Sequence, residues 1–299
     1  MKVGNILSRM LSPIIKLDRR IIFLVTLIAI SLPLIYNYSI TPARMETAEI
    51  AYDKLEQIES SSFVLIAMDW DPSAQSENRP QTEVIIEHLM RKRVPFGVIS
   101  QIALSTPFLD QVPQNIATKL EQETGEKWQY GVDWVNFGYR PGGTIMIQKF
   151  AKSEDLHKFF QTDANSVSIN DFAIMKDIKT IKDIQVLVQI TGFVGTFNSW
   201  LQFFRNDGHV PVMIHGCTAI TIPEAYNYFL TNQISGLFEG VAGAAWYDEL
   251  LSRSYATRKP SNASITTTAL SIGNILIIIF IILGNLQELM KKFRRRGNN

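Results

Sequence analysis

IIFLVTLIAISLPLIYNYSI, residues 21–40, decides how this chain is organised, because it runs for twenty residues without a charged side chain. An α-helix of that length crosses the hydrocarbon core of a bilayer. A second apolar run, residues 265–284, lies near the other end of the sequence. We therefore predict two transmembrane helices with one large domain, residues 41–264, between them.

Basic residues lie at the outer end of each apolar run. Residues 1–20 carry five Lys or Arg against one acid, and residues 285–299 contain a block of five basic residues. The positive-inside rule then predicts two cytoplasmic tails and an extracytoplasmic domain. In a bacterium this would be a two-pass protein of the inner (plasma) membrane with a periplasmic or external domain. A cleaved signal peptide is the alternative, but Tyr36-Asn37-Tyr38 follows the first run in place of small residues.

The composition favours one sizeable folded domain. Of the 299 residues, 46% are hydrophobic, and the roughly 220 residues between the runs suit one α/β domain with its own core. A net charge of +1 gives no electrostatic case for nucleic acid as a partner. The single cysteine, Cys217, excludes an intrachain disulfide and a multi-cysteine zinc site, and we predict that it packs near a strand end. We predict no metal or cofactor.

Short apolar runs alternate with amphipathic stretches along the domain. Continuous apolar runs are typical of strands buried on both faces of a parallel sheet, and the alternation implies right-handed β-α-β crossovers. We predict strands at residues 62–68, 96–102, 132–137, 185–190 and 210–214, and helices at residues 80–93, 112–123, 196–205, near Tyr226, and 232–251. The fold class is α/β, a Rossmann-like domain with a mainly parallel sheet of about five strands. The pattern of residues 138–183 is less regular, and the sequence does not decide whether they form a separate subdomain.

Polar residues follow several of the predicted strands. Ligands of parallel α/β sheets bind outside the carboxyl ends of the strands, so these side chains are candidates for one crevice. They are Asp69, Asp71, Asn136, Arg140, Thr191, Gly192, His215 and Thr218.

Asp69-Trp70-Asp71 resembles the first motif of haloacid-dehalogenase-like phosphatases. The resemblance implies a nucleophile at Asp69, an acid/base at Asp71 and a bound magnesium ion. The chain departs from the family at Pro72-Ser73, where a threonine or valine is usual, and a downstream acidic pair is missing. An ordinary aspartate turn or helix cap fits the same residues.

Three weaker patterns involve glycine or cysteine. His215 and Cys217 are two apart on a predicted strand, a spacing that suits a thiolate-imidazole pair, although Gly216 interrupts the strand. Gly192-x-x-Gly195 precedes a predicted helix, whose free amides suit an anion. In the second apolar run, Asn274 is an amide that needs a partner, either the first span, another subunit or interfacial water, and Gly273 permits close helix contact.

The function that these patterns favour is a membrane-anchored extracytoplasmic binding or assembly module, a non-enzymatic subunit of a membrane protein complex. The expected partners are the lipid bilayer, other membrane or envelope proteins, and further copies of the chain. The tails of about twenty and fifteen residues are too short for an output domain, so a signal would have to pass through a partner. The alternative is a membrane-tethered, metal-dependent hydrolase of phosphorylated or cell-envelope substrates that uses Asp69 and Asp71.

Overall fold

The computed structural model describes residues 19–206 and 208–296, so most of the first basic tail lies outside the described residues. The chain divides into two compact units, one of residues 1–40 with 265–299 and one of residues 41–264. Residues 138–183 belong to the same unit as the rest of the domain.

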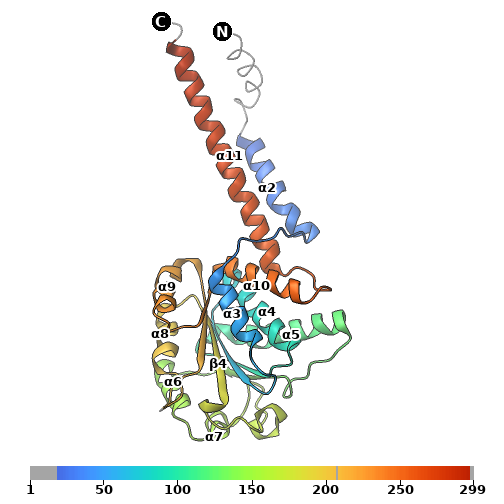
Figure 1. The fold of residues 1–299 in the computed structure, drawn as a ribbon, viewed down its shortest axis with the longest axis vertical. Coiled ribbons are helices and arrows are strands. Elements are labelled where there is room, and N and C mark those ends of the chain that lie inside the picture. The colour runs from blue at the N-terminus through green and yellow to red at the C-terminus, as the bar shows by residue number, and fades with distance from the viewer. Residues whose placement is uncertain (1–18, 207, 297–299) are drawn as a thin grey trace. The chain divides into compact units, whose positions relative to one another are not determined.

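Two helices of the first unit are long enough and apolar enough to cross a membrane (Figure 1). They are α2 (Arg19–Tyr36) and α11 (Asn262–Arg296). Within this unit, a Cβ added at Gly273 would lie 3.1 Å from Ile30 Cδ1, so α11 approaches α2 closely at that glycine. The Ile40 amide also donates to Thr268 Oγ1 at 3.0 Å.

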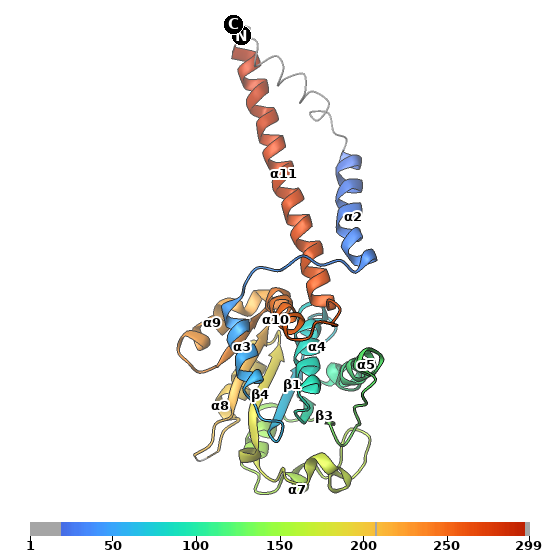
Figure 2. The same ribbon diagram turned by 45° about the vertical axis from the view of Figure 1, so that its right-hand side comes forward.

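The second unit is built on a single sheet of six parallel strands, in the order β3-β2-β1-β4-β5-β6. Figure 2 labels β4, β1 and β3; β4 is next to β1, and β2 lies between β1 and β3. The strands are β1 (Phe63–Asp69), β2 (Phe96–Ser100), β3 (Trp134–Tyr139), β4 (Ile184–Thr191), β5 (Val212–Cys217) and β6 (Gly236–Glu239). Every residue of β1 is buried, which explains its continuous apolar sequence.

The sheet has one strand more than the predicted five. The sixth, β6, lies inside residues 232–251, where the spacing of small residues predicted one continuous helix. Gly236 is needed here for packing, because a Cβ at this position would come within 2.7 Å of the Ala51 backbone. Gly240, with φ +58°, then turns the chain from β6 into the following helix.

Helices cover both faces of the sheet (Figure 1). One face carries α3 (Glu46–Glu56), α4 (Gln75–Arg91), α5 (Thr106–Thr124) and α10 (Gly240–Ser254). The other carries α6 (Gly143–Ala151), α7 (Leu156–Phe160), α8 (Val194–Phe203) and α9 (Ile222–Leu230). Short 3-10 turns lie at η2 (Ala103–Ser105), η3 (Ile169–Asp171), η4 (Ala173–Met175), η5 (Ile181–Asp183) and η6 (Ala219–Thr221).

Two helices begin earlier than the sequence predicted, and both contain a proline. Helix α4 begins at Gln75, five residues before Pro80, and α5 begins at Thr106, well before Pro113. Both prolines lie inside their helices, whereas we had expected α4 to start at Pro80. Gly125 ends α5 in the left-handed conformation.

Candidate functional site

The strand order reverses between β1 and β4. The chain moves outward from β1 through β2 to β3 and then returns to the other side of β1. In open parallel sheets this switch point is where ligands bind, at the carboxyl ends of the two strands. Asp69, the last residue of β1, pairs there with Thr191, the last residue of β4.

Asp69 is completely buried at this point. Its Oδ1 accepts hydrogen bonds from the Gln101 amide at 2.7 Å and from Ser100 Oγ at 3.0 Å, and its Oδ2 accepts one from Trp200 Nε1 at 2.6 Å. Burial raises the pKa of Asp69, and these three donors act against the rise by favouring the charged form. The carboxyl group thus ties the end of β2 and helix α8 to the end of β1.

Asp71 lies in the turn that follows β1, partly exposed. Its Oδ1 accepts from Ser73 Oγ at 2.6 Å and from the Ser73 amide at 2.9 Å. These hydrogen bonds hold the pKa of Asp71 below its usual value. The two aspartates therefore have different surroundings, one inside the sheet and one in a surface turn. Across residues 19–206 and 208–296, no three His, Cys, Asp or Glu side chains group into a possible metal site.

The loops after β4 and β5 contain three more of the predicted residues. Thr191 Oγ1 donates to the Asp69 carbonyl at 2.6 Å and accepts from the Phe193 amide at 2.9 Å. The hydroxyl group of Thr191 therefore already has a donor and an acceptor partner within the protein. A Cβ added at Gly192 would lie 3.0 Å from Thr218 Cγ2, so the two loops are in tight contact. The structure brings Asp69, Thr191, Gly192 and Thr218 together mainly as a packed junction.

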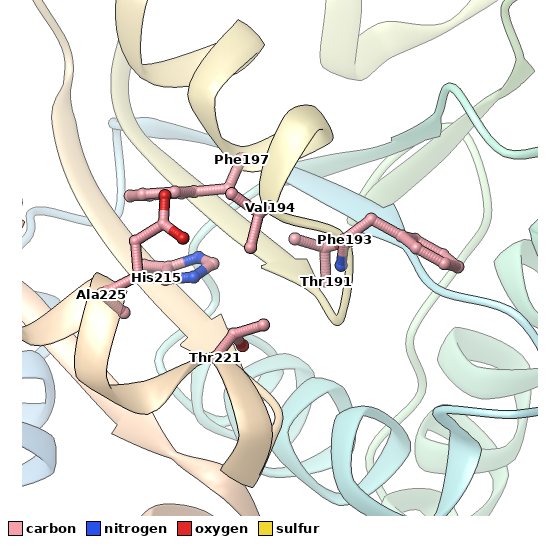
Figure 3. Close-up of a pocket in the computed structure, with 8 residues that line it drawn as sticks. Thr191, Phe193, Val194, Phe197, His215, Thr221 and Ala225 are labelled. Atoms are coloured by element: carbon pink, nitrogen blue, oxygen red, sulfur yellow. The ribbon is translucent and has the colours of Figure 1, made fainter.

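A small pocket of about 10 Å³, room for about one water molecule, lies beside this junction, and His215 forms part of its wall (Figure 3). The ring of Phe197 stacks on His215 at 4.0 Å, whereas the ring of Phe193 points away from it. The residues that line the pocket are Thr191, Phe193, Val194, Phe197, His215, Thr221, Glu224 and Ala225.

His215 is neutral in this setting. Its Nδ1 lies 3.0 Å from the Gln189 carbonyl oxygen, which can only accept, so Nδ1 carries the proton and Nε2 is an acceptor. Burial lowers the pKa of His215 to about 3. The pocket therefore offers a neutral acceptor to a small hydrogen-bond donor, and His215 is a poor proton-transfer group near neutral pH.

Asn136 and Arg140 lie elsewhere, along the edge strand β3 and the turn after it. Asn136 Nδ2 donates to Asp110 at 2.6 Å, and Asn136 Oδ1 accepts from the Gly138 amide at 2.8 Å. Arg140 donates to the carbonyls of Phe137 at 2.7 Å and Thr162 at 2.6 Å. These two residues are thus separated from the His215 pocket by the strands between them, and the eight predicted residues do not line a single crevice.

Cys217 is fully buried at the end of β5, as the sequence predicted. Its Sγ donates to the Phe238 carbonyl at 3.4 Å. Burial raises the pKa of the Cys217 thiol to about 12, so the thiol is protonated at neutral pH and is a weak nucleophile.

Two glutamates near the carboxyl ends of the strands were not among the sequence candidates. Glu77 accepts from the Ala219 amide at 2.8 Å and so holds the loop after β5 against α4. Glu224 lines the His215 pocket from the first turn of α9. An acid directly after Pro223 was a usable signal for Glu224, because acids favour the first turn of a helix.

No family model matches the chain, and neither a curated protein nor a solved structure matches it.

Proposed function

We propose that this protein is a membrane-anchored, extracytoplasmic binding and assembly module, a non-enzymatic subunit of a complex that includes further copies of itself. Its domain is Rossmann-like on this proposal, because the strand order 3-2-1-4-5-6 is the order of doubly wound dinucleotide-binding sheets. The basic residues beyond the two apolar helices support cytoplasmic tails and an external domain.

The observation that carries the proposal is the position of Asn274. It is the tenth of the twenty residues in the second apolar run. The neighbouring Gly273 is buried against Ile30 of α2, whereas the Asn274 side chain is exposed and has no hydrogen-bond partner among the described residues. If α11 crosses a bilayer, this amide lies near the middle of the hydrocarbon, where it requires a polar partner.

A second copy of the chain meets that requirement. An amide carries both a donor and an acceptor. Two α11 helices related by a twofold axis therefore present matching groups to each other, because the same patch serves both subunits. Such a hydrogen bond contributes roughly 0.5–2 kcal/mol in a membrane, enough to select a contact without creating the whole interface.

The hydrolase alternative receives less support from the geometry. Asp69 is buried and binds three donors, and Asp71 is engaged in its own turn. Neither carboxylate faces the His215 pocket as a lining residue. No observation in the domain favours a phosphorylated substrate.

The test is the mass of the particle extracted from native membranes into polymer-bounded lipid discs, with identification of the chains it contains. We expect a defined oligomer for the natural sequence and a smaller particle for Asn274→Leu. Asn285→Leu is the matched control, because the same substitution eleven residues later falls on the same helix face near the end of the apolar run. A single chain per disc for the natural sequence, or identical masses for all three proteins, would refute self-assembly through this face.

A further inference from the structure

A second pocket, of about 350 Å³, opens beside the edge strand β3. We propose that it binds a neutral saccharide. The inference deepens the proposed function by naming a ligand class. It rests on that function for one point, which is that the pocket faces sugars outside the membrane. The residues that line the pocket are Asp110, Gln111, Gln114, Asn115, Tyr130, Trp134 and Asn165. The volume lies within the range of small-molecule sites.

One wall of the pocket is a polar strip of helix α5. Asp110 and Gln111 are followed one turn later by Gln114 and Asn115, a spacing that places all four side chains on one face of the helix. Three of them are amides, and each amide offers both donors and an acceptor. Sugar hydroxyls are also donors and acceptors at once, so a row of amides matches a row of hydroxyl groups.

Two aromatic residues also line the pocket. The rings of Tyr130 and Trp134 pack edge to face with centroids 5.9 Å apart. Tyr130 Oη donates to Asp163 at 2.6 Å and accepts from the Asn136 amide at 3.2 Å, which fixes the ring in place. Burial and the Asp163 carboxylate raise the pKa of Tyr130, so the phenol remains neutral. Trp134 is buried and Tyr130 is half-buried, so Tyr130 is the ring that can meet the apolar C–H face of a pyranose.

The charge of the pocket selects against anions. None of its lining residues is basic, and Asp110 adds a carboxylate. Asp110 Oδ1 already accepts from Asn136 at 2.6 Å, which orients the group and leaves its other oxygen for a ligand hydroxyl. Phosphates and acidic sugars would be repelled, because two like charges in a partly desolvated site disfavour each other.

The edge strand itself is closed to a peptide. The Asn136 carbonyl accepts from the Ala164 amide at 2.9 Å, and the Asn136 amide donates to Tyr130 Oη. These bonds occupy the backbone groups that an added strand would need at the middle of β3. The pocket is therefore suited to a compact polyhydroxyl ligand and not to strand addition.

The experiment measures binding of chitotetraose and maltotetraose by calorimetry to the full chain in lipid discs, free of glycoside detergents. Glucose 6-phosphate serves as the anionic probe. We expect at least one tetrasaccharide to bind and the phosphate not to bind. Gln114→Arg, which places a long charged side chain in the pocket, should weaken binding at least tenfold. Gln122→Arg is the matched control, because it is exposed two turns later on α5 and lies outside the pocket.

Three results would overturn the assignment. They are no binding of either tetrasaccharide to the folded chain, equal weakening by both arginine variants, and binding of glucose 6-phosphate in place of the sugars. The measurement needs neither self-assembly nor a particular topology. If neither sugar binds while the natural chain still forms an oligomer that Asn274→Leu reduces, only the saccharide assignment fails. If a sugar binds to a chain that is single in each disc, only self-assembly fails.

Discussion

The two faces of the sheet are held to their helices by different physics. Among the described residues, every ion pair with both side chains less than a tenth exposed lies on the face of α3, α4, α5 and α10. The face of α6, α7, α8 and α9 is held by a cluster of aromatic rings. The buried ion pairs thus make one face depend on the charge of its carboxylates, whereas the other face depends mainly on the fit of its rings.

The charged face centres on Arg258, in the segment between α10 and α11. Its guanidinium donates to Glu87 at 2.6 and 3.0 Å and forms an ion pair with Asp248. Burial alone would raise the pKa of Glu87, but Arg258 and its basic neighbours hold that pKa at about 2. Asp248 also accepts from the Ser261 amide and from Ser264 Oγ. The network therefore fixes the last residues of the domain in one arrangement.

The aromatic face centres on Phe150 of α6. Its ring lies 5.3 Å from Phe159, 5.0 Å from Phe160, 5.0 Å from Phe204 and 6.5 Å from Trp200, measured between centroids. These contacts have no directional partner to satisfy, so their contribution grows with the apolar area they bury. Helices α6–α9 are therefore stabilised mainly by the burial of apolar surface, whereas hydrogen bonds and ion pairs position the segment before α11.

The largest expected effect comes from the aromatic face. Phe150→Ala removes a fully buried ring and should reduce the free energy of unfolding by about 3–5 kcal/mol, because it leaves a cavity. Thermal or denaturant unfolding of the full chain in lipid discs, followed by tryptophan fluorescence, measures the loss. The loss should be the same at low and high pH. A loss that disappears on acidification would contradict the distinction between the faces.

The next effect comes from the charged face. Arg258→Met leaves Glu87 and Asp248 without their main partner and should cost about 3 kcal/mol, the lower end for a broken buried pair, because Lys119 and Arg91 still contact Glu87. Glu87 has a depressed pKa in the folded state, so its contribution is present above about pH 4.5 and is lost as the pH falls towards about 2.

The matched control for this prediction is Arg253→Met. Arg253 pairs with Glu249 in an exposed i,i+4 arrangement, and such pairs are worth about 0.5 kcal/mol or less. If the two arginine variants lose the same stability, the buried network contributes nothing beyond a surface pair.

The smallest expected effect concerns two histidines, one on each face. His88 bonds to Tyr247 at 2.5 Å and to Glu56 at 2.7 Å, yet burial outweighs the carboxylate and lowers the pKa of His88 to about 4. The pKa of His215 falls to about 3. Both folded values lie below the ordinary 6.5, so the unfolded chain takes up protons first and stability falls as the pH drops below about 6.5.

Each histidine should contribute about 2 kcal/mol of lost stability between about pH 7.5 and 5, since one pKa unit corresponds to about 1.4 kcal/mol. Urea unfolding of the natural chain and of His88→Gln and His215→Gln at the two pH values measures this difference. Either variant should show a smaller dependence on pH than the natural chain. Unchanged dependence in both would mean that the histidines have the same pKa in the folded domain as in the unfolded chain.

The sequence predicted the sheet best where a strand is buried on both faces. The run at residues 62–68 matches β1, because a continuous apolar stretch of that length has few alternatives in an α/β chain. The prediction failed at β6, which begins with Gly236 and is followed directly by Gly240, because the spacing of these glycines also fits a helix. What makes Gly236 a strand residue is its contact with Ala51, nearly two hundred residues earlier, and local spacing contains no such information.

The candidate site was less predictable for a similar reason. The sequence places Asp69 and Asp71 two residues apart, with nothing to distinguish them. The structure separates them through partners distant in sequence, because Asp69 binds Trp200 and Asp71 binds Ser73. Strand ends could be located from the sequence, but whether a strand end is open or packed depends on the tertiary contacts of each loop.

The central claim is that the domain lies outside a membrane crossed by α2 and α11, and cysteine labelling tests it most directly. The natural Cys217 is buried, so a Cys217→Ser background removes it with little exposed surface affected. In that background, Lys127→Cys marks an exposed position of the domain, and Asn298→Cys marks the second tail. With a membrane-impermeant maleimide, the account predicts labelling at position 127 in intact cells and at position 298 only after the membrane is opened. Labelling at position 298 and protection at position 127 in intact cells would contradict it.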